Sequence, residues 1–104
     1  MSALPTLQSL ESLTYHADHL NVKFKIDWYQ EDINELIVLL FLSIEPIVIQ
    51  DKIIGADREN IRFNWHDGYF VLNFDYYSQS CWIEGQDSAS TQELATLHLA
   101  ITKK

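Results

Sequence analysis

The residues best suited to metal or acid–base chemistry are few and widely spaced. Two histidines lie three residues apart in His16-Ala17-Asp18-His19, a spacing that suits a shared metal ion in a helix, with His66 and Asp67 as remote ligands. The segment lacks the Glu and the four-residue spacing of an H-E-x-x-H zinc site. We therefore expect a solvated, histidine-bearing loop and no metal centre.

Nucleophilic chemistry would have to use Cys81, the single cysteine, with His66 or His98 as its base. Cys81 alternates with Ile83 on the apolar side of a predicted strand, where a cysteine is a small buried hydrophobe. The chain also lacks a Gly-rich phosphate loop, a nucleophile elbow and a dinucleotide fingerprint. These observations favour a protein without catalytic activity or a cofactor.

Polar and aromatic side chains gather on one face of a three-strand meander predicted over residues 60–84. Asp67-Gly68 is typical of a two-residue hairpin turn, which pairs Trp65 with Phe70 and keeps apolar residues on one face. A second turn around Ser78-Gln79 places Tyr76 opposite Cys81. The open face of the meander then carries Arg62, Asn64, His66, Tyr69, Val71, Asn73, Asp75, Tyr77, Trp82 and Glu84.

This predicted open face is the main candidate binding surface, because aromatic side chains around a central Arg are the composition of interaction hot spots. In the predicted register Arg62, Asn73 and Glu84 share a row. Asp75 faces Trp82, and Asp75 and Glu84 are diagonal neighbours about 7–8 Å apart. Two alternatives stay open: a solvated face whose ion pairs contribute little, or a face covered by the N-terminal arm or a second subunit.

Hydrophobic periodicity predicts the elements around the meander. Residues 20–26 alternate as a strand, and a capping pattern at Asp27 begins a helix over residues 28–44 that Pro46 ends. The capping box Ser90-Thr91-Gln92-Glu93 begins a second helix over residues 90–102. Residues 47–54 form a strand that either joins the sheet or caps the core, and residues 1–19 form an arm with a short helix over 6–14.

These elements predict a single α+β domain over residues 1–104, with an antiparallel sheet of four to five strands and two main helices packed on one face. The order of helix, three strands and helix is similar to that of double-stranded RNA-binding domains, and the resemblance covers element order only. Those domains carry a basic cluster at the start of the last helix. Residues 88–94 contain no Lys or Arg, so the resemblance implies no RNA binding here.

The second half of the first predicted helix is apolar almost all round. Its core stripe is predicted to comprise Ile33, Leu36, Ile37, Leu40 and Ile44. Four further residues lie outside this stripe, namely Val38, Leu39, Phe41 and Leu42. Either the N-terminal arm covers these residues or they form the contact of a symmetric dimer.

Composition and charge exclude several classes of protein. With 47% hydrophobic residues, three Gly and two Pro, the 104-residue chain is neither disordered nor collagen-like. Fifteen acidic residues against seven scattered basic ones give a net charge of −8, which opposes binding to nucleic acid or an anionic membrane. A lone cysteine, no basic residue before Lys23 and a longest apolar run of seven residues predict a cytoplasmic protein without a membrane span.

The sequence therefore favours a small acidic module that binds another, preferably basic, protein or regulates it, since opposite charges accelerate association. We expect neither nucleic acid nor a membrane as partner. One alternative is a small ligand-binding domain or enzyme with a groove lined by Arg62, Tyr69, Asp75, Trp82 and Glu84. The other is a structural homodimer without a ligand.

Overall fold

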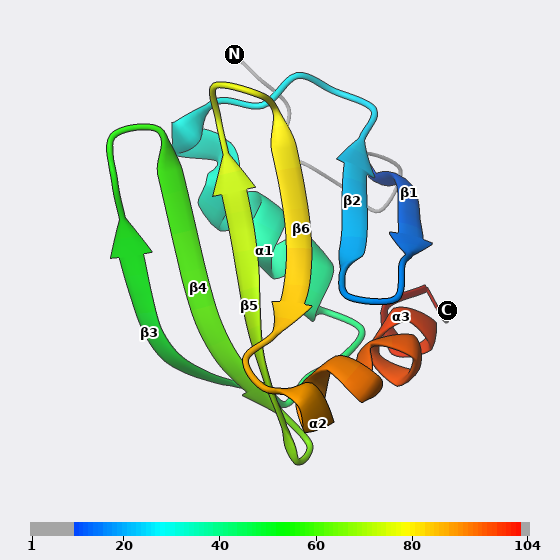
Figure 1. Cartoon of the computed structure of the whole chain (residues 1–104). Helices are drawn as coiled ribbons and strands as arrows, with labels where there is room; N and C mark the ends of the chain where they lie inside the picture. Colours follow the sequence, from blue (N-terminus) through cyan, green and yellow to red (C-terminus); the bar gives the residue numbers. More distant parts are fainter. Residues whose placement is uncertain (1–9, 103–104) are drawn as a thin grey trace.

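The computed structural model describes residues 10–102, which form a six-stranded antiparallel sheet with helices on one side (Figure 1). The strands are β1 (Leu10–Tyr15), β2 (Leu20–Phe24), β3 (Val48–Ile54), β4 (Arg58–Trp65), β5 (Gly68–Asp75) and β6 (Ser80–Gly85). The helices are a 3-10 turn, η2 (Gln30–Asp32), and the α-helices α1 (Ile33–Phe41), α2 (Ser88–Gln92) and α3 (Leu94–Thr102). The predicted α+β class and antiparallel sheet are confirmed, but six strands and three α-helices form within the described residues.

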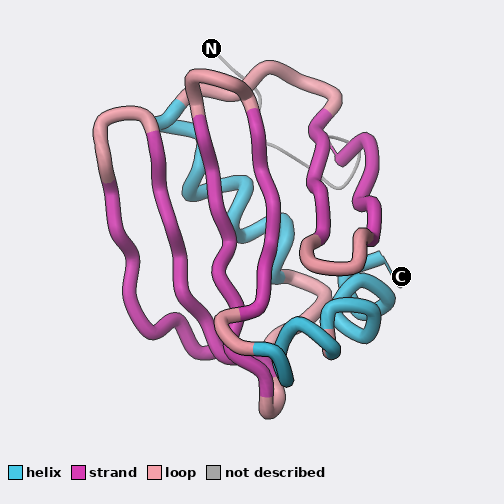
Figure 2. Tube along the Cα trace, in the orientation of Figure 1, coloured by secondary structure: helices cyan, strands magenta, loops and turns pink. Residues whose placement is uncertain are grey.

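The strands lie in the order β1-β2-β6-β5-β4-β3, so the first hairpin extends the meander on the β6 side. Residues 47–54, left open between a strand and a core cap, form β3 at the opposite edge. Figure 2 shows α1 crossing one face of the sheet and α3 on the same side, near the β1–β2 hairpin. Within residues 10–102, no helix has the length and apolar character needed to cross a membrane.

The helix predicted over residues 6–14 is wrong where the structure describes it, because residues 10–15 form β1; residues 6–9 lie outside the described residues. A β-bulge between Leu10 and Ser12 is the physical reason. Leu10 pairs with Phe24 and Leu13 with Val22, so both leucines face the core although they are three residues apart. An extra residue in the strand thus produces a spacing that resembles a helical one.

The β4–β5 hairpin forms with a register two residues away from the predicted one. Trp65 pairs with Gly68, so His66 and Asp67 form the turn, with His66 at φ 55°. Gly68 has no positive φ, and a Cβ atom there would lie 2.6 Å from the ring of Phe70. Glycine is therefore required at position 68 by the close approach of the Phe70 ring and not by the conformation of the turn. The two-residue shift leaves the same residues on the apolar face.

The β5–β6 connection is also longer than predicted, and it shifts this pair of strands by two residues as well. Asn73 faces Trp82 and Asp75 faces Ser80, so the predicted pairing of Asp75 with Trp82 is wrong. Cys81 faces Phe74 rather than Tyr76. The turn spans residues 76–79 because the amide group of Gln79 donates to the carbonyl oxygens of Trp28 and Tyr76 at 2.8 and 3.0 Å.

The first helix is shorter than residues 28–44. Trp28 is 2% exposed, and its backbone N–H donates to the side chain of Gln79 at 3.0 Å. This contact holds the chain before Tyr29 outside the helix. The helical region begins after Tyr29, whose backbone N–H donates to the carboxylate of Asp32 at 2.8 Å, and not at Asp27 as predicted. Regular α-helix follows only from Ile33 to Phe41.

The predicted C-terminal helix is divided into α2 and α3. Asp87 caps α2 by accepting from the backbone N–H of Ser90 at 2.7 Å, so the helical region starts two residues before the predicted boundary. Ser90 is buried, and its hydroxyl oxygen accepts from the Tyr69 N–H at 2.9 Å. These bonds tie the start of α2 to the sheet.

The hydrophobic core lies between the sheet and the helices. Fully buried aromatic rings come from β4 and β5, and aliphatic side chains come from α1 and α3; they include Phe63, Phe70, Phe74, Leu36, Leu40, Leu94 and Leu97. The rings of Phe41 and Phe63 lie 4.7 Å apart, so α1 packs directly on β4. Burial of each such side chain stabilises the fold by about 1.5–3 kcal/mol.

We predict that Gly85→Ala destabilises the protein by more than about 1 kcal/mol, because the new Cβ atom would lie 2.5 Å from the backbone nitrogen of Thr91 in α2. Gly55→Ala is the matched control, since its Cβ atom would meet its nearest neighbour at 3.5 Å. The control should be neutral or slightly stabilising. Urea unfolding measures both free energies, and equal effects of the two substitutions would contradict this account of the β6–α2 packing.

Candidate functional site

One face of the sheet, here called the open face, points away from α1, α2 and α3 (Figure 1). The alternation of the strands places on it eight of the ten residues that the sequence predicted: Arg62, Asn64, Tyr69, Val71, Asn73, Asp75, Trp82 and Glu84. The β2–β6 and β3–β4 pairings add Asn21 beside Trp82 and Asp51 beside Arg62. The open face is therefore continuous across five of the strands.

His66 and Tyr77 lie outside the open face, contrary to the prediction. His66 is in the β4–β5 turn, where its ring lies 4.2 Å from that of Trp65. Tyr77 is in the β5–β6 turn and is 88% exposed. Both differences follow from the two-residue register shifts, which convert predicted strand positions into turn positions.

Asn73 is the centre of the open face, and it is only 4% exposed although no described helix covers it. Its side-chain oxygen accepts from the amide of Asn60 at 2.6 Å. Its amide nitrogen lies 3.3 Å from Glu84 Oε1 and 3.3 and 3.4 Å from the carbonyl oxygens of Val71 and Trp82. Sequence reasoning missed Asn60, whose signal was its alternation with Arg62 and Asn64.

Ion pairs lie on the β3–β4–β5 side of this centre. Arg58 pairs with Asp75 at 3.2 Å, and Arg62 pairs with Asp51 at 3.4 Å. The predicted row of Arg62, Asn73 and Glu84 is wrong at its centre, because the register shifts place Val71 between Arg62 and Glu84 and set Asn73 opposite Trp82. The ion pair of Arg62 is with Asp51 on β3. Asp75 lies opposite Ser80 and no longer diagonal to Glu84, so these residues do not form a paired acid–base site.

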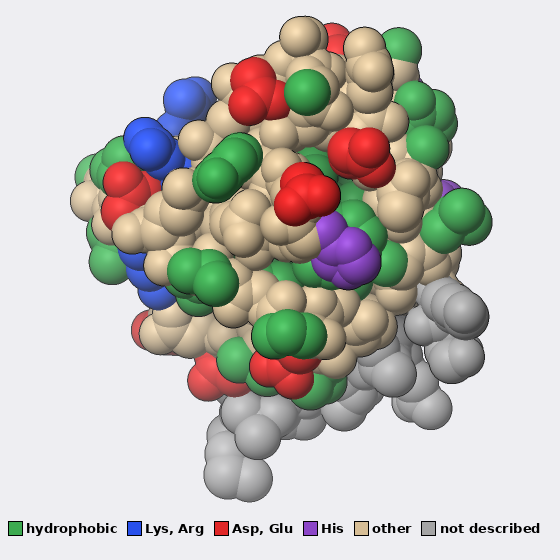
Figure 3. Space-filling view, turned by 90° about the horizontal axis from the view of Figure 1, so that it is seen from below, with side chains coloured by type: hydrophobic (Ala, Val, Ile, Leu, Met, Phe, Trp, Pro, Cys, Tyr) green, Lys and Arg blue, Asp and Glu red, His purple; other side chains and the backbone are tan. Residues whose placement is uncertain are grey.

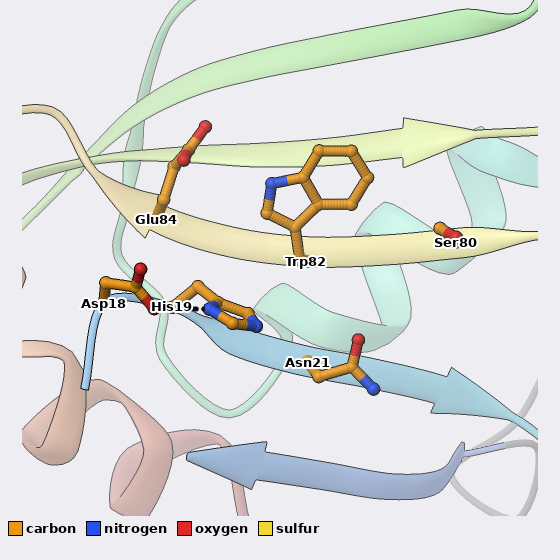
Figure 4. A pocket seen from close by; sticks show the side chains of 6 residues that line it. All are labelled: Asp18, His19, Asn21, Ser80, Trp82 and Glu84. Carbon is orange, nitrogen blue, oxygen red and sulfur yellow. Dashed lines mark hydrogen bonds and ion pairs between the residues drawn. The ribbon is translucent and has the colours of Figure 1, made fainter. Parts of the chain in front are cut away.

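A shallow hollow of about 320 Å³ lies on the other side of the centre (Figure 4). It is lined by Asp18, His19 and Asn21 from the β1–β2 hairpin and by Ser80, Trp82 and Glu84 from β6. Asp18 Oδ1 lies 2.7 Å from His19 Nδ1, and this hydrogen bond lowers the pKa of the Asp18 carboxyl. The sequence suggested His19 only as a metal ligand and did not place Asp18, His19 or Asn21 beside Trp82, because only the β2–β6 pairing brings them there.

The two histidines that suggested a metal site are stacked, with ring centroids 4.6 Å apart. Among residues 10–102, no group of three or more His, Cys, Asp or Glu side chains is arranged to hold a metal ion. Cys81 is 1% exposed, and burial raises the pKa of its thiol well above the usual value. The sulfur therefore stays protonated near neutral pH. His98 is engaged with the Leu13 carbonyl oxygen at 2.7 Å.

A second candidate surface, here called the aliphatic strip, comprises Val38 and Leu42 of α1 with Ile49 and Ile54 of β3, each more than half exposed. Val48 and Ile53 of β3 lie on the other side of the sheet, because they pair with Asn64 and Asn60 on the open face. Lys52 Nζ lies 2.6 Å from Asn34 Oδ1, so β3 runs beside α1. Figure 3 shows hydrophobic side chains together with Lys and Arg on this side of the molecule. Leu39 and Phe41 are 5% exposed core residues and are not available for the predicted interface.

Another hollow, of about 1060 Å³, lies between β1, the end of α1 and α3. Its lining is mainly apolar and includes Leu13, Ile44 and Ile101. Its rim contains Leu10 and Thr102, where the chain continues into residues 1–9 and 103–104. This hollow therefore does not define a site by itself.

Replacement of Asn73 tests the central hydrogen-bond network. Asn73→Ala should lower the free energy of unfolding by about 1–3 kcal/mol, because it leaves the buried amide's former partners unsatisfied. Asn21→Ala, an exposed amide on the same face, should change it by less than about 0.5 kcal/mol. Urea unfolding measures the free energy of unfolding of both variants. Similar losses in Asn73→Ala and Asn21→Ala would show that the network does not stabilise the fold.

Comparison with known proteins supplies the family. No curated protein and no solved structure matches the chain. The sequence profile of one protein family, described as "Protein of unknown function (DUF3630)", matches residues 10–102 and so includes every strand and helix described above. The chain belongs to this DUF3630 family.

Proposed function

We propose that this protein is a non-catalytic protein-binding module that uses the open face, and that its partner is basic. The observation that carries the proposal is Asn73, a nearly buried amide that fixes its neighbours on a face left uncovered by the described helices. Binding surfaces gain affinity from side chains that are ordered before the partner arrives.

The charge of the chain supports a basic partner. A net charge of −8 creates a negative field that attracts a positively charged protein and repels nucleic acid. The carboxylates of Asp18 and Glu84 bring this charge to the hollow beside Trp82. A partly exposed aromatic residue with charged neighbours is the composition of a protein-binding hot spot.

The chemistry of the open face supports binding rather than catalysis. Asp75 and Asp51 are engaged by arginines, and Cys81 lies on the core side of β6. The hollow beside Trp82 is shallow and exposed to water, whereas catalytic groups generally act in enclosed sites that exclude water. A cytoplasmic location, expected from the single cysteine, is part of this proposal.

Self-association through the aliphatic strip is a second candidate function. The supporting observation is the exposure of four branched aliphatic side chains on the helix side of α1 and β3, with Ile54 63% exposed and Val38 59% exposed. Contiguous patches of this kind mark interfaces in many proteins. The β-bulge between Ile49 and Asp51 and the central charges of Asp51 and Lys52 oppose pairing along the strand edge, so a second copy would pack on the side chains.

Site-specific photo-crosslinking in living cells tests the two candidates together. A photoreactive residue placed at Asn21 reports on the open face, one at Val38 reports on the aliphatic strip, and one at Leu99, which is 66% exposed on α3, is the control. We expect the photoreactive residue at position 21 to give a discrete crosslink to another protein in cells. When irradiation is repeated in a lysate, high salt should abolish this crosslink. Leu99 should give none.

Two outcomes would contradict the primary proposal. Equal crosslinks from Asn21 and Leu99 would indicate random collisions rather than a binding surface. Crosslinks only from Val38, and only to a second copy of the chain, would instead favour the homodimer. Trp82→Ala introduced into the Asn21 reporter should remove its crosslink, since it removes the aromatic part of the surface.

A further inference from the structure

We propose that the hollow beside Trp82 binds a cationic side chain of the partner, arginine in preference to lysine, with its charge against Glu84 and its plane on the indole. This inference rests on the proposed binding role and names the chemistry of its contact. The hollow of about 320 Å³ combines the Trp82 indole, two carboxylates, an amide and a hydroxyl with the imidazole of His19. This imidazole is bonded to Asp18, so among the lining residues Glu84 is the carboxylate without a cationic group beside it. An indole beside a carboxylate is complementary to the charge and the planar shape of a guanidinium ion.

The distribution of ion pairs points to Glu84. Asp51 and Asp75 on the open face each have an arginine partner, and Asp18 is bonded to His19. Glu84 contacts the neutral amide of Asn73 at 3.3 Å, and within residues 10–102 it has no cationic partner. Asn73 engages Oε1, so Oε2 is left to accept from a ligand.

The strand geometry puts the carboxylate and the ring at a useful separation. Trp82 and Glu84 are two residues apart on β6, so their side chains leave the same face about 7 Å apart. Figure 4 shows both side chains rising from β6, with the indole seen nearly broadside and Asn21 opposite it on β2. A guanidinium ion can stack on an indole and donate to a carboxylate at the same time, because it is planar and carries donors on its edge.

The surroundings favour a cation over other ligands. Asp18 adds a second carboxylate at the end of the hollow, and its bond to His19 keeps it ionised. An anion would meet two negative charges. A neutral apolar side chain would meet Asp18, Asn21 and Glu84 and leave their polar atoms without partners.

The test is a titration of the full-length ¹⁵N-labelled chain with a capped Gly-Arg-Gly peptide. The control peptide carries citrulline, whose neutral urea group has nearly the shape of the guanidinium. We expect the indole N–H signal of Trp82, assigned with Trp82→Phe, and the backbone signal of Asn21 to shift with the arginine peptide. The indole signals of the buried Trp28 and Trp65 should not shift.

Two variants with the same change in net charge make the test specific. Glu84→Gln should weaken binding of the arginine peptide about tenfold, since the amide still accepts from Asn73 but offers no charge. Glu31→Gln, an exposed position in η2, should leave the affinity unchanged. At Trp82, the affinity should fall in the order Trp, Phe, Leu as the cation–π attraction is lost.

Equal shifts with the citrulline peptide, or equal affinities of the Glu84→Gln and Glu31→Gln variants, would overturn this inference. The failure of the inference is distinguishable from failure of the proposed function. If Asn21 crosslinks to a partner but the arginine peptide neither shifts the Trp82 signal nor competes with the crosslink, the cation site is wrong and the binding role stands. If the peptide competes with the crosslink, both are supported.

Discussion

Packing of α1 and α3 on a single face of the sheet is the constraint on which the other features depend. This arrangement buries Phe63, Phe70 and Phe74 in one core and leaves the opposite face without an apolar cover from the described helices. The opposite face must then be stabilised by hydrogen bonds and side-chain contacts within itself. The Asn60–Asn73–Glu84 network supplies those contacts, and it also orders the side chains that a partner would meet.

The faces of the strands could be predicted from the sequence, but their registers could not. The period of two in β4, β5 and β6 separates apolar from polar residues, and a shift of two residues leaves this separation unchanged. Gly68 resembled a turn residue, but the ring of Phe70 accounts for it. In β1, the bulge gave leucines a helix-like spacing.

The candidate site was predictable only where it depends on local sequence. Trp82, Glu84 and Asn73 follow from strand alternation. Asp18 and Asn21 join them only through the pairing of β2 with β6. These strands are about 60 residues apart in the sequence, and no local sequence pattern predicts that they pair. Asp51 likewise lies beside Arg62 only because β3 pairs with β4, and Arg62 therefore forms its ion pair with Asp51.

Binding through the open face requires that this face is exposed in solution and that Trp82 is accessible. Acrylamide quenching of tryptophan fluorescence tests this requirement directly, because Trp28 and Trp65 are 2% and 6% exposed whereas Trp82 is partly exposed. We expect an easily quenched fraction of the fluorescence in the wild-type chain and the loss of this fraction in Trp82→Phe. An unchanged quenchable fraction in Trp82→Phe would show that this face is covered in solution and would contradict the account.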